Sequence, residues 1–172
     1  INTLKGIGDR SYKPVANLAG SKVVDLLWHL PSGLVDRRYS PKLRDAVPGR
    51  ICTLKVRVIE HIPPKSSKQP YRVIVEDDTE PLTLIFFKAY VDSLQRNLPV
   101  GEERVISGKL DSFNGFWQMS HPDYIVKPAE MDKMLGIETV YTLTAGISNK
   151  MLNKWIKQAL ERVPAFPEWL NE

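Results

Sequence analysis

The chain has 172 residues, a length typical of one domain with flanking segments and too short for a complete motor enzyme. Its 42% hydrophobic and 26% charged residues exclude wholesale disorder and a membrane protein. No apolar run approaches the roughly 20 residues that cross a bilayer, and no signal-peptide pattern is present, so we expect a cytoplasmic protein with no membrane partner. The net charge of +4 equals the excess within residues 1–48, which hold eight Lys and Arg against four Asp and Glu. This excess is compatible with contacts to nucleic-acid phosphates.

The first 48 residues predict helices followed by an irregular basic linker. Residues 9–19 predict a helix of modest quality, interrupted by a proline. Ser21 is expected to cap a second helix, residues 22–30, which has one broad apolar face and a proline directly after it. Residues 32–48 contain several Pro and Gly residues and predict a linker without regular structure.

From residue 49 the hydrophobic pattern changes from a helical period to the alternation of β-strands. Strands are predicted at about residues 54–58, 73–76 and 82–87, followed by a helix at 89–98 and by strands at 104–112 and 116–126. The last two strands are joined by Asn114-Gly115, which suits a tight hairpin turn. Three strands, a helix and a hairpin are the element order of an OB-fold, a small Greek-key barrel that binds oligonucleotides.

The predicted fold class is therefore mixed α/β (α+β): a five-stranded OB-fold Greek-key β-barrel flanked by N-terminal and C-terminal helical segments. The predicted segments are 1–48 (helices and basic linker), 49–127 (barrel) and 128–172 (a linker and a helix at about 148–162). The first residue, Ile1, is not Met, so we expect the chain to be part of a longer protein.

The sequence offers no combination of residues for catalysis. A single cysteine, Cys52, excludes an internal disulfide, and three scattered histidines have no zinc-ligand spacing. His121 has no nucleophile near it in sequence, so it is expected to be a structural histidine, and Cys52 a small strand residue. No Gly-x-x-x-x-Gly-Lys-Ser/Thr phosphate loop occurs. We expect no catalytic residue, metal or cofactor in this chain, which disfavours a stand-alone hydrolase.

Short sequence motifs spread along nearly the whole chain resemble those of a known protein family. They include Leu4-Lys5-Gly6-Ile7-Gly8, Asp25-Leu26-Leu27-Trp28-His29-Leu30-Pro31, Leu84-Ile85-Phe86-Phe87, Leu98-Pro99-Val100-Gly101, Gln118-Met119-Ser120-His121-Pro122-Asp123-Tyr124 and Val140-Tyr141-Thr142-Leu143-Thr144. Each phrase alone is weak, but in this order and combination they resemble the amino-terminal wedge domain of the RecG branched-DNA helicases.

The resemblance implies a parent protein in which the wedge precedes two motor domains that use ATP and Mg²⁺. Such a protein would be bacterial and nucleoid-associated, and would regress stalled replication forks and migrate Holliday junctions in recombination and repair. Implied partners are branched DNA (forks and four-way junctions), the protein's own C-terminal motor domains and a single-stranded-DNA-binding protein.

The resemblance also implies DNA-stacking aromatics where the third predicted strand passes into the helix, at Phe86, Phe87 and Tyr90. Strand alternation puts one of Phe86 and Phe87 into the core and leaves the other as a candidate contact. The family spacing places an aromatic where this chain has Ser93. Either Tyr90 replaces it or only one stacking residue remains.

Two basic groups are candidates for phosphate binding. Lys65 and Lys68 lie in the polar, proline-rich loop expected between the first two strands. Arg37 and Arg38 form the second group together with Arg44, and the alternative for Arg37 is an ion pair with a nearby Asp36 or Asp45.

A second class of function stays open beside branched-DNA binding. In an OB-fold protein-interaction module the same aromatics would pack against a protein partner. The salt dependence of binding distinguishes the two hypotheses, because DNA binding weakens steeply as the salt concentration rises and binding through an apolar interface does not.

Overall fold

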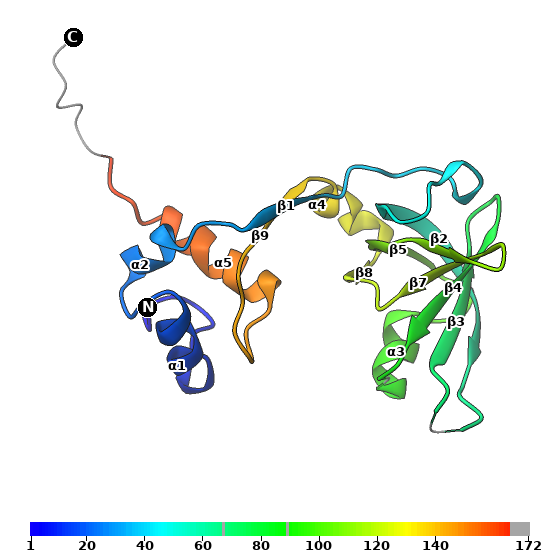
Figure 1. Cartoon of the computed structure of the whole chain (residues 1–172), viewed down its shortest axis with the longest axis horizontal. Helices are drawn as coiled ribbons and strands as arrows, with labels where there is room; N and C mark the ends of the chain where they lie inside the picture. The colour runs from blue at the N-terminus through cyan, green and yellow to red at the C-terminus, as the bar shows by residue number, and fades with distance from the viewer. Residues whose placement is uncertain (67, 89, 166–172) are drawn as a thin grey trace, which may run out of the picture. The chain divides into compact units, whose positions relative to one another are not determined.

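The computed structural model describes residues 1–66, 68–88 and 90–165, which form two compact units (Figure 1). The first unit comprises Ile1–Leu34 and Thr139–Glu172, and the second comprises Val35–Glu138. The N-terminal and C-terminal helical segments therefore share one unit. Residues 35–48 and 128–138, which the sequence assigns to the flanks, belong to the unit that contains the barrel.

The first unit is built from α1 (Asp9–Leu18), α2 (Val23–Trp28) and α5 (Asn149–Leu160) (Figure 1). Its core consists of side chains from all three helices, among them Val15, Leu26, Leu152 and Trp155. The helices are thus held by packing of apolar faces, which is what stabilises short helices in proteins.

Helix ends in this unit follow their local polar contacts. The carboxylate of Asp25 accepts a hydrogen bond from the backbone N–H of Lys22 at 2.8 Å, so α2 is capped at Lys22 and not at the predicted Ser21. Helix α5 is capped by Ser148, whose side chain accepts from the backbone N–H of Met151 at 3.3 Å. Helix α1 continues through its proline without the predicted interruption.

The predicted linkers contain regular structure. Strands β1 (Gly33–Asp36) and β9 (Ile137–Val140) pair in a two-stranded sheet. Short helical turns occupy the remainder: η1 (Leu43–Asp45), η2 (Pro128–Glu130) and α4 (Met131–Met134). A strand of four residues is too short to show alternation, and each partner lies far away in the sequence, so neither strand was predicted.

The second unit is a seven-stranded sheet with α3 (Val91–Asn97) beside it (Figure 1). The strands are β2 (Ile51–Ile62), β3 (Tyr71–Glu76), β4 (Pro81–Phe86), β5 (Glu103–Lys109), β6 (Asp111–Phe113), β7 (Phe116–Ser120) and β8 (Tyr124–Val126). Their order is β6-β7-β4-β3-β2-β5-β8. Strands β2, β3 and β4 form an antiparallel meander, β2 also pairs with β5, and β4 pairs in parallel with β7. This is the connectivity of an OB-fold, and the predicted mixed α/β class is confirmed.

The last two predicted strands are each divided in two. The first division lies at Leu110, between β5 and β6, where the side chain is fully buried. The second follows β7 at His121, whose φ of +47° is left-handed and cannot continue a strand. The predicted hairpin turn is present, with positive φ at Asn114 (51°) and Gly115 (81°) joining β6 to β7.

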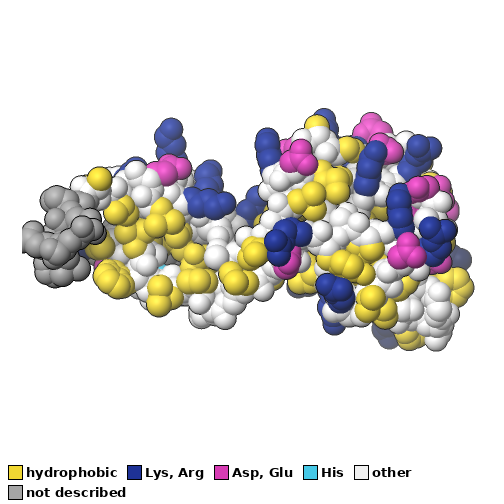
Figure 2. All heavy atoms as spheres, turned by 90° about the horizontal axis from the view of Figure 1, so that it is seen from above, with side chains coloured by type: hydrophobic (Ala, Val, Ile, Leu, Met, Phe, Trp, Pro, Cys, Tyr) yellow, Lys and Arg dark blue, Asp and Glu magenta, His cyan; other side chains and the backbone are white. Residues whose placement is uncertain are grey.

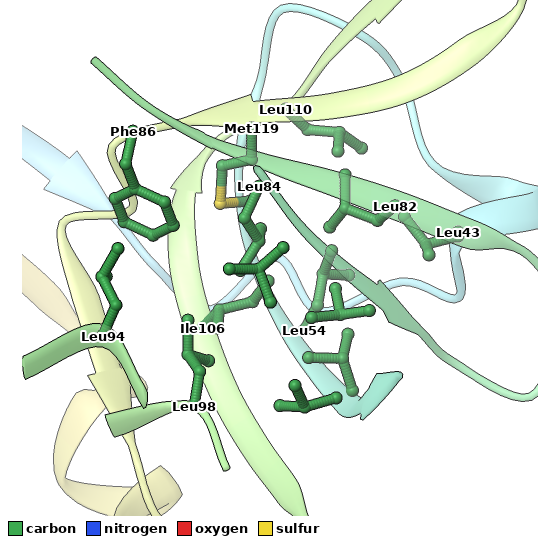
Figure 3. Packing of buried hydrophobic residues seen from close by; sticks show 14 of the residues in the cluster. Leu43, Leu54, Leu82, Leu84, Phe86, Leu94, Leu98, Ile106, Leu110 and Met119 are labelled. Atoms are coloured by element: carbon green, nitrogen blue, oxygen red, sulfur yellow. The ribbon is translucent and has the colours of Figure 1, made fainter. Parts of the chain in front are cut away.

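One continuous core fills the second unit (Figure 3). It consists of inward-facing side chains of the strands together with Leu43 of η1, Leu94 of α3, and Leu98 and Leu110 from connecting segments. Gly108 is required by this packing, because a Cβ there would lie 2.9 Å from the sulfur of Met119. Within the described residues, the helices are all too short or too polar to cross a membrane.

Candidate nucleic-acid interface

The register of the sheet brings two separate segments to the same end of the second unit. Tyr71, the first residue of β3, pairs with Phe86, the last residue of β4. At the same end, Ile62 closes β2 opposite Arg72. The loop that connects β2 to β3 and the segment that connects β4 to α3 therefore leave the sheet side by side. These two segments carry four of the seven predicted site residues, and a fifth, Phe86, closes β4 directly before the second segment.

The structure separates the three predicted aromatics by burial. Phe86 is only 7% exposed and joins the core, where its ring lies near Leu94 of α3 (Figure 3). Phe87 is 67% exposed and Tyr90 is 86% exposed. The expectation that one of the two phenylalanines enters the core is met by Phe86, and the candidate stacking residues are reduced to Phe87 and Tyr90. Ser93, on the first turns of α3, is half-buried.

The lysines of the β2–β3 loop are exposed. The loop is closed by its own hydrogen bonds, since the Lys65 N–H donates to Oε1 of Gln69 at 3.1 Å and the Gln69 N–H donates to the Ser66 carbonyl at 3.0 Å. These bonds use backbone groups and the Gln69 side-chain amide. The ammonium groups of Lys65 and Lys68 take no part in them. They are thus suited to binding phosphate as point charges.

Two further basic residues lie at this end of the sheet and were missed in the sequence. Lys88 is exposed and directly follows Phe87. Arg72 is exposed between the buried Tyr71 and Val73 of β3. Two features of the sequence could have identified them: Lys88 lies between the aromatic residues Phe87 and Tyr90, and Arg72 occupies an outward-facing position of an alternating strand. We define the candidate interface as Phe87, Lys88 and Tyr90 together with Lys65, Lys68 and Arg72.

Arg37 lies in the interior of the second unit, with 6% of its surface exposed. Its guanidinium donates to Oε2 of Glu138 at 2.8 Å, to Oδ2 of Asp123 at 3.0 Å and to Oγ of Ser107 at 3.0 Å. It also lies over the Tyr124 ring, 4.7 Å from the centroid. The predicted partners Asp36 and Asp45 were wrong for this residue. Arg37 is a structural ion-pair centre, because its donors are engaged inside the fold.

Hydrogen bonds and neighbouring charges shift the pKa values of Arg37 and Tyr124. Burial disfavours its charge, but hydrogen bonds to Glu138 and Asp123 outweigh burial and raise the pKa of the guanidinium. Burial and the neighbouring Glu138 raise the pKa of Tyr124 to about 12, and its hydroxyl donates to Oε1 of Glu138 at 2.9 Å. Arg37 is therefore charged and the Tyr124 hydroxyl is neutral at physiological pH.

Arg38 is exposed but already paired. It donates to Oδ1 and Oδ2 of Asp36 at 2.9 and 2.7 Å, and these hydrogen bonds lower the pKa of Asp36 to about 2. The hydroxyl of Thr53 donates to the Arg37 carbonyl at 2.9 Å, which ties both arginines to the start of β2. The candidate interface lies beyond the far end of that strand. The structure therefore does not bring Arg37 and Arg38 together with the other predicted residues.

Other potentially reactive groups in the described part of the chain are buried or paired. Cys52 is fully buried, and burial raises the pKa of its thiol to about 11, so it is unreactive near neutral pH. Across residues 1–66, 68–88 and 90–165, no three His, Cys, Asp or Glu side chains converge as a metal site. A shallow hollow contains Lys42 and Lys55, but Lys42 pairs with Asp78, and Lys55 with Glu103 at 2.9 Å. On the second unit in Figure 2, basic and acidic side chains are likewise interspersed.

Comparison with known proteins agrees with this architecture. The family model described as the RecG wedge domain matches residues 1–163. The chain is 27% identical to the ATP-dependent DNA helicase RecG of Aquifex aeolicus, covering 100% of this chain and 21% of that protein. It is 25% identical to the protein of the same name from Escherichia coli K12, covering 94% of this chain and 23% of the relative.

A solved structure of a relative matches this chain over its full length. A structure of RecG bound to a three-way DNA junction superposes with a TM-score of 0.81 at 25% identity, covering 100% of this chain and 24% of that one. The chain thus spans about a fifth to a quarter of the length of these relatives. The resemblance noted in the sequence is confirmed, and the chain belongs to the RecG wedge domain family.

Proposed function

We propose that this chain is the branched-DNA-binding wedge of an ATP-dependent DNA helicase. One observation carries the proposal: Phe87 and Tyr90, 67% and 86% exposed, lie on one short segment with Lys88. The matched structure, which is of RecG on a three-way DNA junction, supports the same class of ligand. In this proposal the two rings stack on bases that are parted at the branch point.

The chemistry of the candidate interface suits a junction better than a continuous duplex. Each ring stacked on an unpaired base contributes about 1–3 kcal/mol, whereas paired bases inside a helix offer no free face. Lys65, Lys68 and Lys88 supply charge for the phosphates of the strands that leave the branch. Specificity for branched DNA then comes from the aromatics, and general affinity comes from the lysines.

We further propose that ATP and Mg²⁺ act in the remaining three quarters or more of the parent protein. No phosphate-binding loop occurs in these 172 residues, and the relatives are named ATP-dependent helicases. The parent's motor domains would pull duplex DNA against the wedge, which regresses stalled forks and migrates Holliday junctions. A nucleoid location and contact with a single-stranded-DNA-binding protein belong to this proposal.

Binding titrations of the chain with a three-way fork and with a linear duplex of equal length, at the same salt, test the proposal. We expect tighter binding to the fork, and a loss of roughly 5- to 150-fold for Phe87→Ala or Tyr90→Ala, the equivalent of one lost stack. Phe116→Ala is the matched control, because Phe116 is 72% exposed but lies at the opposite end of the β4–β7 pair. Equal affinity for fork and duplex, or an equal loss from Phe116→Ala, would contradict the proposal.

The first unit has a surface of a different kind. Trp28, Leu30 and Leu34 are 77%, 71% and 67% exposed, and Figure 2 shows hydrophobic side chains gathered on one face of this unit. Apolar exposure of this kind marks a protein contact. We propose that the occupant is the rest of the parent protein, of which this chain is about a quarter or less. Trp28→Ser should then weaken association with the separately produced remainder, and unchanged association would contradict this contact.

A further inference from the structure

We infer that His121 is a positioning residue for Phe87: its imidazole holds the exposed ring at the end of β4 in the orientation that receives a base. The inference rests on the proposed function, because it concerns how the proposed stacking residue is held. It assigns to His121 a role beyond general support of the fold.

The backbone of His121 places its side chain against the end of β4. Its N–H donates to the carbonyl of Ile85 at 2.9 Å, just beyond the parallel pairing of Ile85 with Ser120. Its φ of +47° then turns the chain sharply at the end of β7. Histidine is among the few residues other than glycine that adopt this region with some frequency. The turn is what allows the imidazole to contact both residues that follow Ile85.

The imidazole satisfies a backbone group that the sheet leaves unpaired. Phe87 is the first residue after β4, and its N–H donates to Nε2 of His121 at 3.1 Å. An accepting Nε2 carries no proton, so the ring that makes this bond is neutral with its proton on Nδ1. The bond fixes the backbone of Phe87 at the point where the chain leaves the sheet.

The same ring contacts both phenylalanines. Its centroid lies 5.9 Å from that of Phe86 in an edge-to-face arrangement, and 5.6 Å from that of Phe87 at an interplanar angle of 35°. Phe86 is fixed in the core, so His121 forms a bridge from the rigid core to an exposed ring. A ring held in place before DNA arrives loses less conformational entropy when it stacks, which increases affinity.

Three substitutions in the chain separate the acceptor from the ring. In His121→Asn the new side chain suits the left-handed backbone but is too short to reach the Phe87 N–H. His121→Phe keeps an aromatic ring but has no acceptor atom. His121→Gln keeps an acceptor oxygen at a similar distance from the backbone. We expect His121→Asn and His121→Phe to weaken fork binding by about 3- to 10-fold, on the scale of one immobilised side chain. We expect His121→Gln to retain most of the affinity. Melting curves establish that each variant is folded.

A double-mutant cycle gives the decisive measurement. If His121 acts through Phe87, His121→Asn should cost no further fork affinity in a Phe87→Ala background. Amide exchange of Phe87 in the ¹⁵N-labelled chain, measured without DNA, should accelerate in His121→Asn and not in His121→Gln.

Two results would overturn the inference while leaving the proposed function intact: additive losses of affinity in the cycle, or unchanged fork binding by His121→Asn when Phe87→Ala binds weakly. A Phe87→Ala variant that binds forks normally would instead remove the proposed stacking contact, and the inference with it. The Phe87 amide exchange then shows whether the hydrogen bond itself exists.

Discussion

Phe86 and Phe87 are adjacent in the chain but occupy opposite environments, with 7% and 67% of their surfaces exposed. The alternation of β4 places Phe86 in the core beside Leu94, and Phe87 leaves the strand into solvent next to His121. Phe86 therefore contributes to the stability of the fold, and its neighbour Phe87 to the proposed DNA binding. A mutation of Phe86 should lower stability, whereas a mutation of Phe87 should weaken binding and leave stability unchanged.

Phe86→Ala should destabilise the second unit by about 3–5 kcal/mol, because it leaves a cavity between β4 and α3 that the surrounding side chains cannot fill. Chemical denaturation of the chain measures this loss directly. Phe86→Leu is the control and should cost much less, since most of the apolar volume is retained. A Phe86→Ala chain as stable as the original would show that the ring is not part of the core.

Tyr90→Ala should weaken fork binding by about 1–3 kcal/mol while leaving the melting temperature unchanged, because its ring is exposed and stacks only on DNA in the proposed function. Tyr90→Phe should bind forks almost normally, since stacking needs the ring and not the hydroxyl. Fluorescence anisotropy on a labelled fork, paired with thermal melts, separates the two quantities. A Tyr90→Ala chain that melts early but binds forks normally would assign Tyr90 to packing.

The sequence was enough to predict the barrel but not the identity of the buried aromatic. Hydrophobic residues occupy both faces of the third predicted strand, with Leu84 and Phe86 on one side and Ile85 and Phe87 on the other. Only pairing with β3, whose Tyr71 and Val73 are buried, decides which set enters the core. Local pattern cannot supply that information, because it depends on a partner strand.

The ion-pair partners of Arg37 could not be predicted from the sequence for a similar reason. Its carboxylate partners, Asp123 and Glu138, lie 86 and 101 residues away in the chain. The nearby acidic residue, Asp36, pairs with Arg38 instead. The proximity of charges in sequence therefore suggested ion pairs but assigned them to the wrong arginine.

Arg37→Met should destabilise the chain by about 3–5 kcal/mol, because it removes the buried positive charge that pairs with both Glu138 and Asp123. Arg38→Met is the matched control, since its ion pair with Asp36 is exposed on both sides and should contribute little to stability. Urea unfolding of both variants tests the difference. Similar midpoints for the two variants would contradict the structural role of Arg37.

Replacing both Lys65 and Lys68 by Ala should reduce the salt dependence of fork binding. Each lysine that neutralises a phosphate contributes about 0.7–0.9 to the slope of log K against log[salt], so the pair should remove about 1.4–1.8. Lys55→Ala is the control, because its ammonium pairs with Glu103 at 2.9 Å. An unchanged slope in the double variant would place the β2–β3 loop outside the interface.

The stability of the second unit should fall in acid partly through Asp77. Burial of this carboxyl opposes its charge, but hydrogen bonds from the Thr79 hydroxyl and from the backbone N–H groups of Leu43, Glu80 and Thr79 outweigh burial and lower its pKa. A carboxyl whose pKa is lower in the folded state stabilises the fold above its unfolded pKa, here 3.8, and that contribution is lost as the pH falls through the folded value.

Asp77→Asn should therefore lower stability at pH 7 by about 1–3 kcal/mol, because it weakens the hydrogen bonds that join η1 to the β3–β4 turn. The variant should also lose less stability than the original chain between pH 4 and pH 2. Asp78→Asn is the control for an exposed carboxyl: the hydrogen bond from Lys42 also lowers its pKa, but solvent screening keeps its contribution to stability small. Urea midpoints at pH 7, 4, 3 and 2 provide the measurement, and parallel acid profiles for Asp77→Asn and the original chain would show that Asp77 is not the linked group.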